Sequence, residues 1–401
     1  MKIIQINSVY NSGSTGKIVY DCHKYYLSQG VDSLVCFGRG QETQDKGVFK
    51  VCTELYSKLN NLYSRLSGIM YGGLMFSTKR LISIIAKEKP DVVHLHCING
   101  YFINIYKLVT YLNNNKIPTV LTLHAEFMYT GNCGHAFECE KWKTGCGKCA
   151  NFRQITKSLF IDNTSRSWAM MKRSFDGFGD NLIVTSVSPW LYERASNSPI
   201  LNQFKHKVVL NGIDTSVFKL RTPSTIRYEK RENEKIVFFV TPEFSIDPQH
   251  IKGGKYVFEL AKELKDITFL IAGPYDTSIV FPRNVVMLGM VNDKETLSEY
   301  YNIADVTLLT SKRETFSMVC AESLCCGTPV IGFKAGAPEK ISLPEYSKWV
   351  DYGNLDALKK TLVSALDQVV EKQKISDKAK LVYDRNIMAD NYLSVYNELL
   401  S

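Results

Sequence analysis

Short apolar runs alternate with longer stretches of helical period along the first half of the chain. The runs that predict strands are 2–7, 31–37, 92–95, 119–123, 182–187 and 207–210. Of the helical patterns among them, the first ends near residue 29, and the others cover about 55–70, 77–88 and 102–114. Because strands that alternate with helices pair in parallel, this half predicts a sheet with helices on both faces.

The same alternation restarts in the second half. Strands are predicted at 236–240, 267–273, 285–288, 305–310 and 330–333, with helices at about 254–264, 294–302, 353–372 and 376–400. The polar, charged stretch 215–235, which contains Pro223, has the composition of a linker. We therefore expect an α/β fold with two Rossmann-like, doubly wound domains, 1–210 and 215–380, followed by the segment 381–401.

The length and composition of the chain are consistent with two folded domains. With 401 residues, 45% of them hydrophobic and 22% charged, the chain is long enough for two domains that each bury a core. It has no run of about eighteen apolar residues, so no membrane-spanning helix is expected. Gln5 and Asn7 interrupt the apolar start where a signal peptide needs an unbroken run. We therefore expect a cytoplasmic protein whose eleven cysteines stay reduced or bind metal.

The net charge indicates which classes of binding partner to expect. Lys and Arg outnumber Asp and Glu by 49 to 40, a net charge of +9, which fits anionic substrates or anionic lipid head groups. No basic run with interleaved aromatic residues and no nucleic-acid module is recognisable, so a nucleic-acid partner is not expected. One predicted helix has an apolar stripe made of Leu55, Leu59, Leu62, Leu66 and Ile69. We expect this stripe to pack in the core; if exposed, it would suit docking on a membrane surface.

The most distinctive stretch of the chain runs from Arg313 to Glu322. It follows the predicted strand 305–310, so Glu314 lies on the loop that leaves a strand and Glu322 on the helix beyond. In open α/β sheets, ligands bind in the crevice at the carboxyl ends of the strands. A carboxylate on such a loop is therefore expected to face the ligand.

The helix in this stretch begins near Phe316 and Ser317 and ends at Gly327. Its first turn directs backbone N–H groups and the positive end of the helix dipole toward the same crevice, which suits a phosphate. Two carboxylates on either side of an anion site can accept hydrogen bonds from two sets of hydroxyls. This combination predicts a nucleoside diphosphate sugar as the ligand.

The stretch resembles the signature of the retaining glycosyltransferases of GT-B fold, in which seven residues separate two glutamates. The matching positions are Ser311, Glu314, Phe316, Glu322, Gly327, Pro329 and Val330. The resemblance implies that Glu314 holds hydroxyls of the transferred sugar and that Glu322 holds the ribose of the nucleotide. It also implies a last helix that crosses back to the first domain. Further implied donor contacts are Arg313, Thr315, Phe316 and Ser317.

A lysine before a helix of the second half matches the same family. Lys252 is followed by Gly253 and Gly254, and the resemblance implies that its ammonium contacts the donor diphosphate. The alternative is a solvated lysine. Members of the family often have an arginine a few residues earlier, whereas this chain reads Thr241-Pro242-Glu243 there. Arg313 or helix N–H groups would then have to neutralise the diphosphate.

Histidines end two predicted strands of the first half. His124 follows the strand 119–123, and the resemblance implies that its imidazole or backbone approaches the donor sugar. A buried structural histidine is the alternative. His94 and His96, on another strand, are expected to face opposite sides, so that one of them reaches the cleft.

Three loop residues are implied to lie beside the donor. Gly16 ends a glycine turn that has some likeness to a phosphate loop but lacks its spacing, because only two residues separate Gly13 from Gly16. Asn211 begins the family's Asn-Gly-Ile-Asp loop, whose alternative is a plain turn. Glu339 ends a Gly-Ala-Pro-Glu loop that is also similar to one in the family.

Four cysteines lie close together in a glycine-rich insertion at 131–150. They are Cys133, Cys139, Cys146 and Cys149. Thiolates at such short separations can converge on one tetrahedral zinc, and the last two cysteines have the spacing of half such a site. Reduced cysteines or a disulfide are the alternatives. Structural zinc is thus a hypothesis, and a catalytic role is not expected.

Together these features predict a retaining glycosyltransferase of cell-surface polysaccharide biosynthesis. A hexose would move from a donor in 215–380 to the hydroxyl of a lipid-linked or glycan acceptor in 1–210, with peripheral contact to an anionic membrane on its cytoplasmic face. No catalytic metal is expected, because a lysine and helix N–H groups can stabilise the leaving diphosphate. The rivals are a GT-B epimerase or phosphorylase and a zinc-containing nucleic-acid-binding module.

Overall fold

The computed structural model describes residues 1–226 and 228–401, which divide into two compact units. Unit 1 comprises Met1–Leu210 together with Met388–Ser401, and unit 2 comprises Asn211–Ile387. The stretch 215–235, predicted as a linker, belongs to unit 2, and residue 227 in it lies outside the described residues. No helix in the described ranges is both long and apolar enough to cross a membrane.

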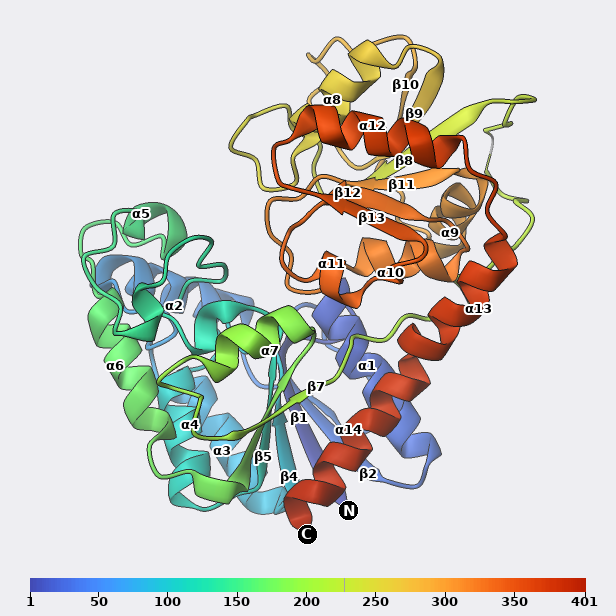
Figure 1. Ribbon diagram of the computed structural model, residues 1–401. Coiled ribbons are helices and arrows are strands. Elements are labelled where there is room, and N and C mark those ends of the chain that lie inside the picture. Colours follow the sequence, from blue (N-terminus) through green and yellow to red (C-terminus); the bar gives the residue numbers. More distant parts are fainter. Residues whose placement is uncertain (227) are drawn as a thin grey trace. The chain divides into compact units, whose positions relative to one another are not determined.

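Unit 1 contains a parallel sheet of seven strands in the order β3-β2-β1-β4-β5-β6-β7 (Figure 1). Its strands are β1 (Lys2–Val9), β2 (Asp32–Arg39), β3 (Val48–Lys50), β4 (Val92–Leu95), β5 (Thr119–Leu123), β6 (Leu182–Ser186) and β7 (Lys205–Val208). Its α-helices are α1 (Gly13–Ser28), α2 (Glu54–Ser67), α3 (Phe76–Glu88), α4 (Ile105–Asn114), α5 (Phe152–Ile155), α6 (Thr164–Phe175), α7 (Pro189–Ser196) and most of α14 (Arg385–Leu400). The strand order reverses at β1, and ligand crevices of such sheets open beside this switch point.

Unit 2 contains a parallel sheet of six strands in the order β10-β9-β8-β11-β12-β13. Its strands are β8 (Lys235–Val240), β9 (Ile267–Ala272), β10 (Val285–Gly289), β11 (Val306–Leu309), β12 (Val330–Phe333) and β13 (Ser347–Val350). Its α-helices are α8 (Gly254–Glu263), α9 (Lys294–Ile303), α10 (Met318–Cys325), α11 (Pro338–Ile341), α12 (Leu355–Leu366) and α13 (Lys372–Tyr383). Here the order reverses at β8, so the switch point lies between β8 and β11. The predicted fold of two doubly wound α/β domains is confirmed.

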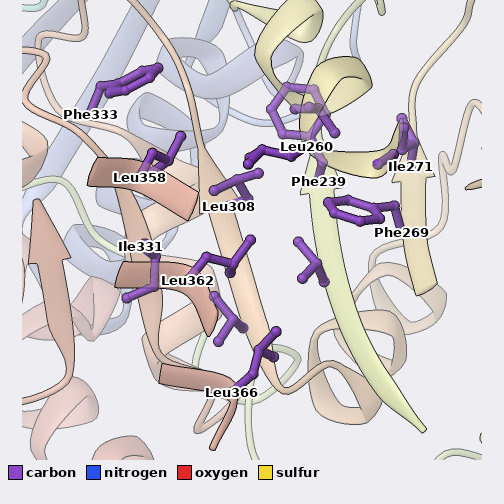
Figure 2. Packing of buried hydrophobic residues seen from close by; sticks show 14 of the residues in the cluster. Phe239, Leu260, Phe269, Ile271, Leu308, Ile331, Phe333, Leu358, Leu362 and Leu366 are labelled. Atoms are coloured by element: carbon purple, nitrogen blue, oxygen red, sulfur yellow. The ribbon is translucent and has the colours of Figure 1, made fainter. Parts of the chain in front are cut away.

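Unit 2 packs its main core between one face of the sheet and two helices. Strands covered on both faces need apolar side chains on both, which explains their continuous hydrophobic runs. Figure 2 shows the cluster, in which α8 contributes Leu260 and α12 contributes Leu358, Leu362 and Leu366. The strand side chains that meet them include Phe239, Phe269, Ile271, Leu308, Ile331 and Phe333.

The core of unit 1 is completed by the end of the chain. Tyr392 and Tyr396 of α14 are fully buried against the sheet, together with Tyr26 of α1. The sheet side chains of this cluster are Ile3, Val92, Val120 and Ile183. The hydroxyl of Tyr396 also lies 2.6 Å from Nδ1 of His94. The expectation that the last helix returns to the first domain is therefore confirmed.

The single helix predicted for 376–400 is two helices, α13 and α14. The backbone N–H of Ile213 donates to the carbonyl of Tyr383 at 2.6 Å, and the N–H of Arg385 donates to the carbonyl of Ile213 at 3.0 Å. This bridge between Ile213 and Asp384 holds the chain extended at Asp384 and ends α13. Among the other differences, α12 ends at Leu366, and β7 begins two residues before the predicted 207–210. The sequence analysis did not predict β3, β13, α5, α6, α7 and α11.

Helix α2 turns its apolar stripe to solvent, so the expectation that the stripe packs in the core is wrong. The exposed fractions of Leu55, Leu59, Leu62 and Leu66 are 69%, 49%, 51% and 47%. The side chains that α2 buries are Ser57, Asn60 and Ser64. Only Ile69, beyond the end of the helix, is buried as expected. The helix is thus attached to unit 1 through its polar face.

Candidate active site

Lys252 and Glu314 meet at the switch point of the unit 2 sheet. Lys252 lies on the loop after β8, and Glu314 on the loop after β11, its neighbour in the sheet. The Nζ of Lys252 is 2.6 Å from Oε1 of Glu314. The two side chains remain 27% and 18% exposed, so a ligand can reach both. Two residues far apart in sequence therefore form one charged pair at the edge where α/β sheets bind ligands.

The end of β11 holds the loop that carries Lys252. The buried hydroxyl of Thr310 lies 3.0 Å from the backbone carbonyls of both Lys252 and Gly253 and donates to them. Gly253 has a φ of +67°, and a Cβ at this position would lie 2.3 Å from the carbonyl oxygen of Thr310. Only glycine fits this conformation and this approach without movement of the backbone. The base of the lysine side chain is therefore fixed by the neighbouring strand.

The loop after β12 fixes the backbone of Glu314. Its N–H donates to the carbonyl of Ala335 at 3.0 Å, and its carbonyl accepts from the N–H of Ala337 at 3.2 Å. The carboxylate of Glu339 accepts hydrogen bonds from the N–H groups of Ala335 and Gly336, both at 3.0 Å. Glu339 therefore shapes the loop against which Glu314 rests. Its predicted contact with the donor stays a prediction.

The start of α10 is strained. Ser317, its N-cap residue, has φ 93° and ψ 90°, and its hydroxyl accepts a hydrogen bond from the N–H of Cys320 at 3.3 Å. Phe316, 3% exposed, packs edge-on against the ring of Tyr383. Backbone strain of the kind seen at Ser317 costs about 1–3 kcal/mol and is concentrated at functional sites. The helix start also offers backbone N–H groups to an anion.

Glu322 lies within α10 and is partly buried. It accepts a hydrogen bond from the hydroxyl of Tyr301 at 3.1 Å. Burial raises the pKa of the Glu322 carboxyl to about 7, although this hydrogen bond acts in the opposite direction. A carboxyl that changes charge near neutral pH suits a ligand that supplies hydroxyl donors.

The sequence analysis did not predict two residues that support the candidate site. Thr310 ends the apolar run 305–310, and a polar residue at the carboxyl end of a predicted strand was a usable signal. Tyr301 lies in α9, and no sequence pattern marks it as a partner of Glu322. The predicted donor residues Arg313 and Thr315 flank Glu314 on its loop and are both partly buried.

In unit 1, His124 joins a row of buried histidines. Its Nε2 lies 3.3 Å from Nδ1 of His96, and burial lowers its pKa to about 4. The rings of His94 and His96 are 3.8 Å apart, so the expectation that they face opposite sides is wrong. Residues two apart on a strand share a face. His94 is held further by the hydroxyl of Thr122, 2.6 Å from its Nε2. This geometry favours the buried structural alternative for the His124 imidazole, and its approach to a donor stays a prediction.

Gly16 and Asn211 occupy tight loops. Gly16 lies in the first turn of α1, where a Cβ would be 3.0 Å from Cγ2 of Val9, and its carbonyl accepts from the N–H of Asn11 at 2.9 Å. This close packing of α1 on the end of β1 explains the glycine. Asn211 belongs to unit 2 and is 6% exposed. Its Oδ1 is buried and lacks a hydrogen-bond partner within the described residues.

The cysteine insertion contains free thiols. The N–H of Gly131 donates to Sγ of Cys146 at 3.0 Å. Burial is the main cause that raises the pKa of Cys146 to about 11, and charge at Cys139 and Cys149 raises it further. The four cysteines thus lie close enough together for charge on one thiol to raise the pKa of another. Across residues 1–226 and 228–401, however, no three His, Cys, Asp or Glu side chains are arranged to hold a metal ion. The zinc site stays a prediction.

Comparison with known proteins identifies the unit that contains the charged pair. Residues 226–382, most of unit 2, match the family model described as Glycosyl transferases group 1. Unit 2 is therefore similar to the glycosyltransferases of this group. The match favours transfer over the epimerase, phosphorylase and nucleic-acid-binding alternatives.

Relatives and solved structures extend the similarity to glycosyltransferases over the whole chain. It is 23% identical to the putative colanic acid biosynthesis glycosyl transferase WcaC of Escherichia coli K12, over 100% of both chains. Sucrose-phosphate synthase of Thermosynechococcus elongatus superposes with a TM-score of 0.69 at 14% identity, covering 100% of this chain and 99% of the other. HepE of Anabaena, solved with UDP-glucose, has a TM-score of 0.64 at 13% identity, covering 99% and 100%. The chain therefore has the GT-B fold along its full length.

Proposed function

We propose that the protein is a retaining hexosyltransferase that uses a nucleoside diphosphate sugar. The contact between Lys252 and Glu314 carries this proposal. A carboxylate accepts hydrogen bonds from sugar hydroxyls, whereas an ammonium 2.6 Å away donates to phosphate oxygens. The pair therefore suits the junction between the sugar and the diphosphate, which is the bond that breaks.

The other donor contacts follow from this placement. The strained start of α10 at Ser317 would take the phosphates on its N–H groups, with Arg313 and Thr315 beside them. Glu322, deeper along the same helix, would accept hydrogen bonds from the ribose. Gly16, His124, Asn211 and Glu339 are proposed to line the donor site. Because these groups stabilise a leaving diphosphate, the reaction needs no catalytic metal.

The acceptor and the pathway are also part of the proposal. HepE was solved with UDP-glucose, which supports a uridine diphosphate hexose as donor for this chain. The printed name of the E. coli relative supports transfer to a lipid-linked or glycan acceptor in the biosynthesis of a cell-surface polysaccharide. With such an acceptor, the enzyme works on the cytoplasmic face of a membrane.

Two measurements test the proposal. Thermal-shift screening against nucleoside diphosphate sugars, followed by turnover of the best ligand, should identify a hexose donor; stabilisation by none of them would contradict it. The anomeric configuration of the product, read by proton NMR, should equal that of the donor, and inversion would overturn the retaining assignment. Turnover should also survive brief treatment with EDTA. Activity that is lost and restored only by Mg²⁺ or Mn²⁺ would contradict the metal-free mechanism.

A further inference from the structure

Helix α2 belongs to an exposed apolar surface of unit 1. Phe160 and Ile161, 71% and 48% exposed, lie at its end, because the N–H of Leu159 donates to the carbonyl of Arg65 at 2.8 Å. At the other end, the ring of Phe76, 75% exposed, lies edge-on to that of Tyr56. The segments 55–80 and 148–175 hold nine of the 21 exposed large hydrophobic side chains of the described residues. We call these two segments the α2 surface.

The orientation of α2 is fixed by polar contacts. The side chain of Asn60 donates to the carbonyl of Tyr101 at 2.9 Å and accepts from the N–H of Leu74 at 2.8 Å. Ser57 lies beside Cys52, with 3.2 Å between Oγ and Sγ. Rotation of the helix to bury its leucines would break these contacts. The partner groups in unit 1 would then be buried against leucine side chains without hydrogen bonds, which costs free energy. The leucines therefore face outward as a stable property of the unit.

The charge of the α2 surface is strongly one-sided. Together with Glu54, the first residue of α2, and Asp176, which pairs with Lys172 at the end of α6, the two segments contain ten Lys and Arg residues and three Asp and Glu residues. This part of the chain thus carries a net charge of +7, out of +9 for the whole chain. Lys58, Arg65, Arg153 and Lys157 are among the exposed basic residues. Basic residues next to an apolar helical stripe are the pattern that binds an anionic bilayer surface.

We propose that the α2 surface docks on a membrane leaflet that contains anionic lipids, with the leucines of α2 inserted between the head groups. A second copy of this chain is a poorer occupant, because a symmetric contact would press like charges together. The inference rests on the proposed function only in the choice of a membrane that carries the acceptor. Its test uses no transfer reaction, so the two can fail separately.

The experiment is sedimentation with vesicles of phosphatidylcholine alone or mixed with phosphatidylglycerol. The intact protein should bind the mixed vesicles, and binding should weaken as salt is added. Leu59→Gln/Leu62→Gln and, separately, Lys58→Gln/Arg65→Gln should each weaken binding at least about tenfold, because each removes one of the two attractions. The matched control is Val280→Gln/Leu381→Gln, which changes apolar side chains of unit 2 that are 87% and 76% exposed. It should bind like the intact protein.

Three outcomes would overturn the proposal. They are an intact protein that ignores phosphatidylglycerol vesicles at low salt, α2 variants that bind as tightly as the control, and light scattering that shows a dimer abolished by Leu59→Gln/Leu62→Gln. The last result would assign the surface to a second copy. Circular dichroism and the melting temperature should be unchanged in the α2 variants, which would show that they fold.

Discussion

Oε1 of Glu314 and Nζ of Lys252 lie 2.6 Å apart, so each group is neutralised by the other before a donor binds. Because the pair is partly exposed, its own contribution to stability is small, about 0–1 kcal/mol. In the proposed donor site, a sugar hydroxyl would bind Glu314 and a phosphate oxygen would bind Lys252. Changes at the two positions should therefore alter ligand handling far more than folding.

Glu314→Gln and Glu322→Gln should separate sugar recognition from nucleotide recognition. A lost hydrogen bond to a charged acceptor costs about 1.5–3 kcal/mol, roughly ten- to a hundredfold. Glu322→Gln should weaken both the free nucleoside diphosphate and the full donor. Glu314→Gln should leave free nucleotide binding unchanged or slightly tighter, because Lys252 loses its carboxylate, while turnover falls. Calorimetry and steady-state kinetics measure the two effects, with the exposed Glu263→Gln as control. Equal loss of nucleotide affinity in both variants would contradict the assignment.

Nucleotide affinity should depend on pH through Glu322. Its pKa is raised to about 7 by burial, so the carboxyl of the empty site gains a proton as the pH falls below 7. A protonated carboxyl accepts fewer hydrogen bonds from ribose, and affinity should drop by up to about tenfold per pH unit below the pKa. Calorimetry from pH 8 to pH 5.5 tests this. Glu322→Gln serves as the reference, because it keeps the titration of the nucleotide; a slope equal to that of the intact protein would refute the prediction.

Gly253→Ala should destabilise unit 2 more than a matched glycine change. Gly289 has a similar φ of +66°, but a Cβ there meets nothing within 4 Å. Gly289→Ala should therefore cost only the strain of a left-handed residue, about 1–2 kcal/mol. At Gly253 the contact with Thr310 adds a steric cost of about 1–3 kcal/mol. Urea unfolding measures both, and equal midpoints would show that the loop yields without cost. Turnover of Gly253→Ala should also fall, because Lys252 moves.

Unit 1 should lose stability on acidification. Burial holds the pKa values of His94, His96 and His124 below their usual range. Below pH 6.5 these three imidazoles are protonated in the unfolded chain but stay neutral in the folded unit. The free energy of unfolding therefore falls by up to about 1.4 kcal/mol per pH unit for each histidine. For His124 this loss continues to about pH 4. Denaturation followed between pH 7.5 and 5 should show this slope, and His124→Asn should reduce it. His250→Gln, in unit 2, should leave it unchanged.

The cysteine insertion should hold one zinc ion per chain if its thiols converge when metal is supplied. Protein purified without a histidine tag provides the material for metal analysis. A chelator should then lower the melting temperature, and Mg²⁺ should not restore it. Four freely titrating thiols and a zinc content near zero would leave Cys133, Cys139, Cys146 and Cys149 as ordinary reduced cysteines.

The sequence pattern predicted most strands, and the loops that carry Lys252 and Glu314, because parallel sheets impose a regular alternation. It assigned Lys252 and Glu314 to one crevice by resemblance. Their direct contact could not be predicted, since it depends on β8 and β11 being neighbours in the sheet. Similarly, the break at Asp384 depends on pairing with Ile213, which no local pattern reveals.

Helix α2 shows another limit of sequence patterns. Helical periodicity tells which residues share a face, but not which face turns inward. The inward face was decided by Asn60, whose partners are backbone groups near Tyr101 and Leu74. The error at His94 and His96 had a different origin, because the two-residue period of a strand already places them on the same side.

The use of the end of the chain to complete unit 1 has a consequence for synthesis in the cell. The strands of unit 1 leave the ribosome first, but Tyr392 and Tyr396 follow only after residues 211–387 have been made. At ordinary translation rates, this interval lasts about 10–35 s. During that time the apolar face around Ile3 and Val120 has no helical cover from α14. Unit 2 can therefore finish folding before unit 1, and the nascent first unit is a natural client for a chaperone.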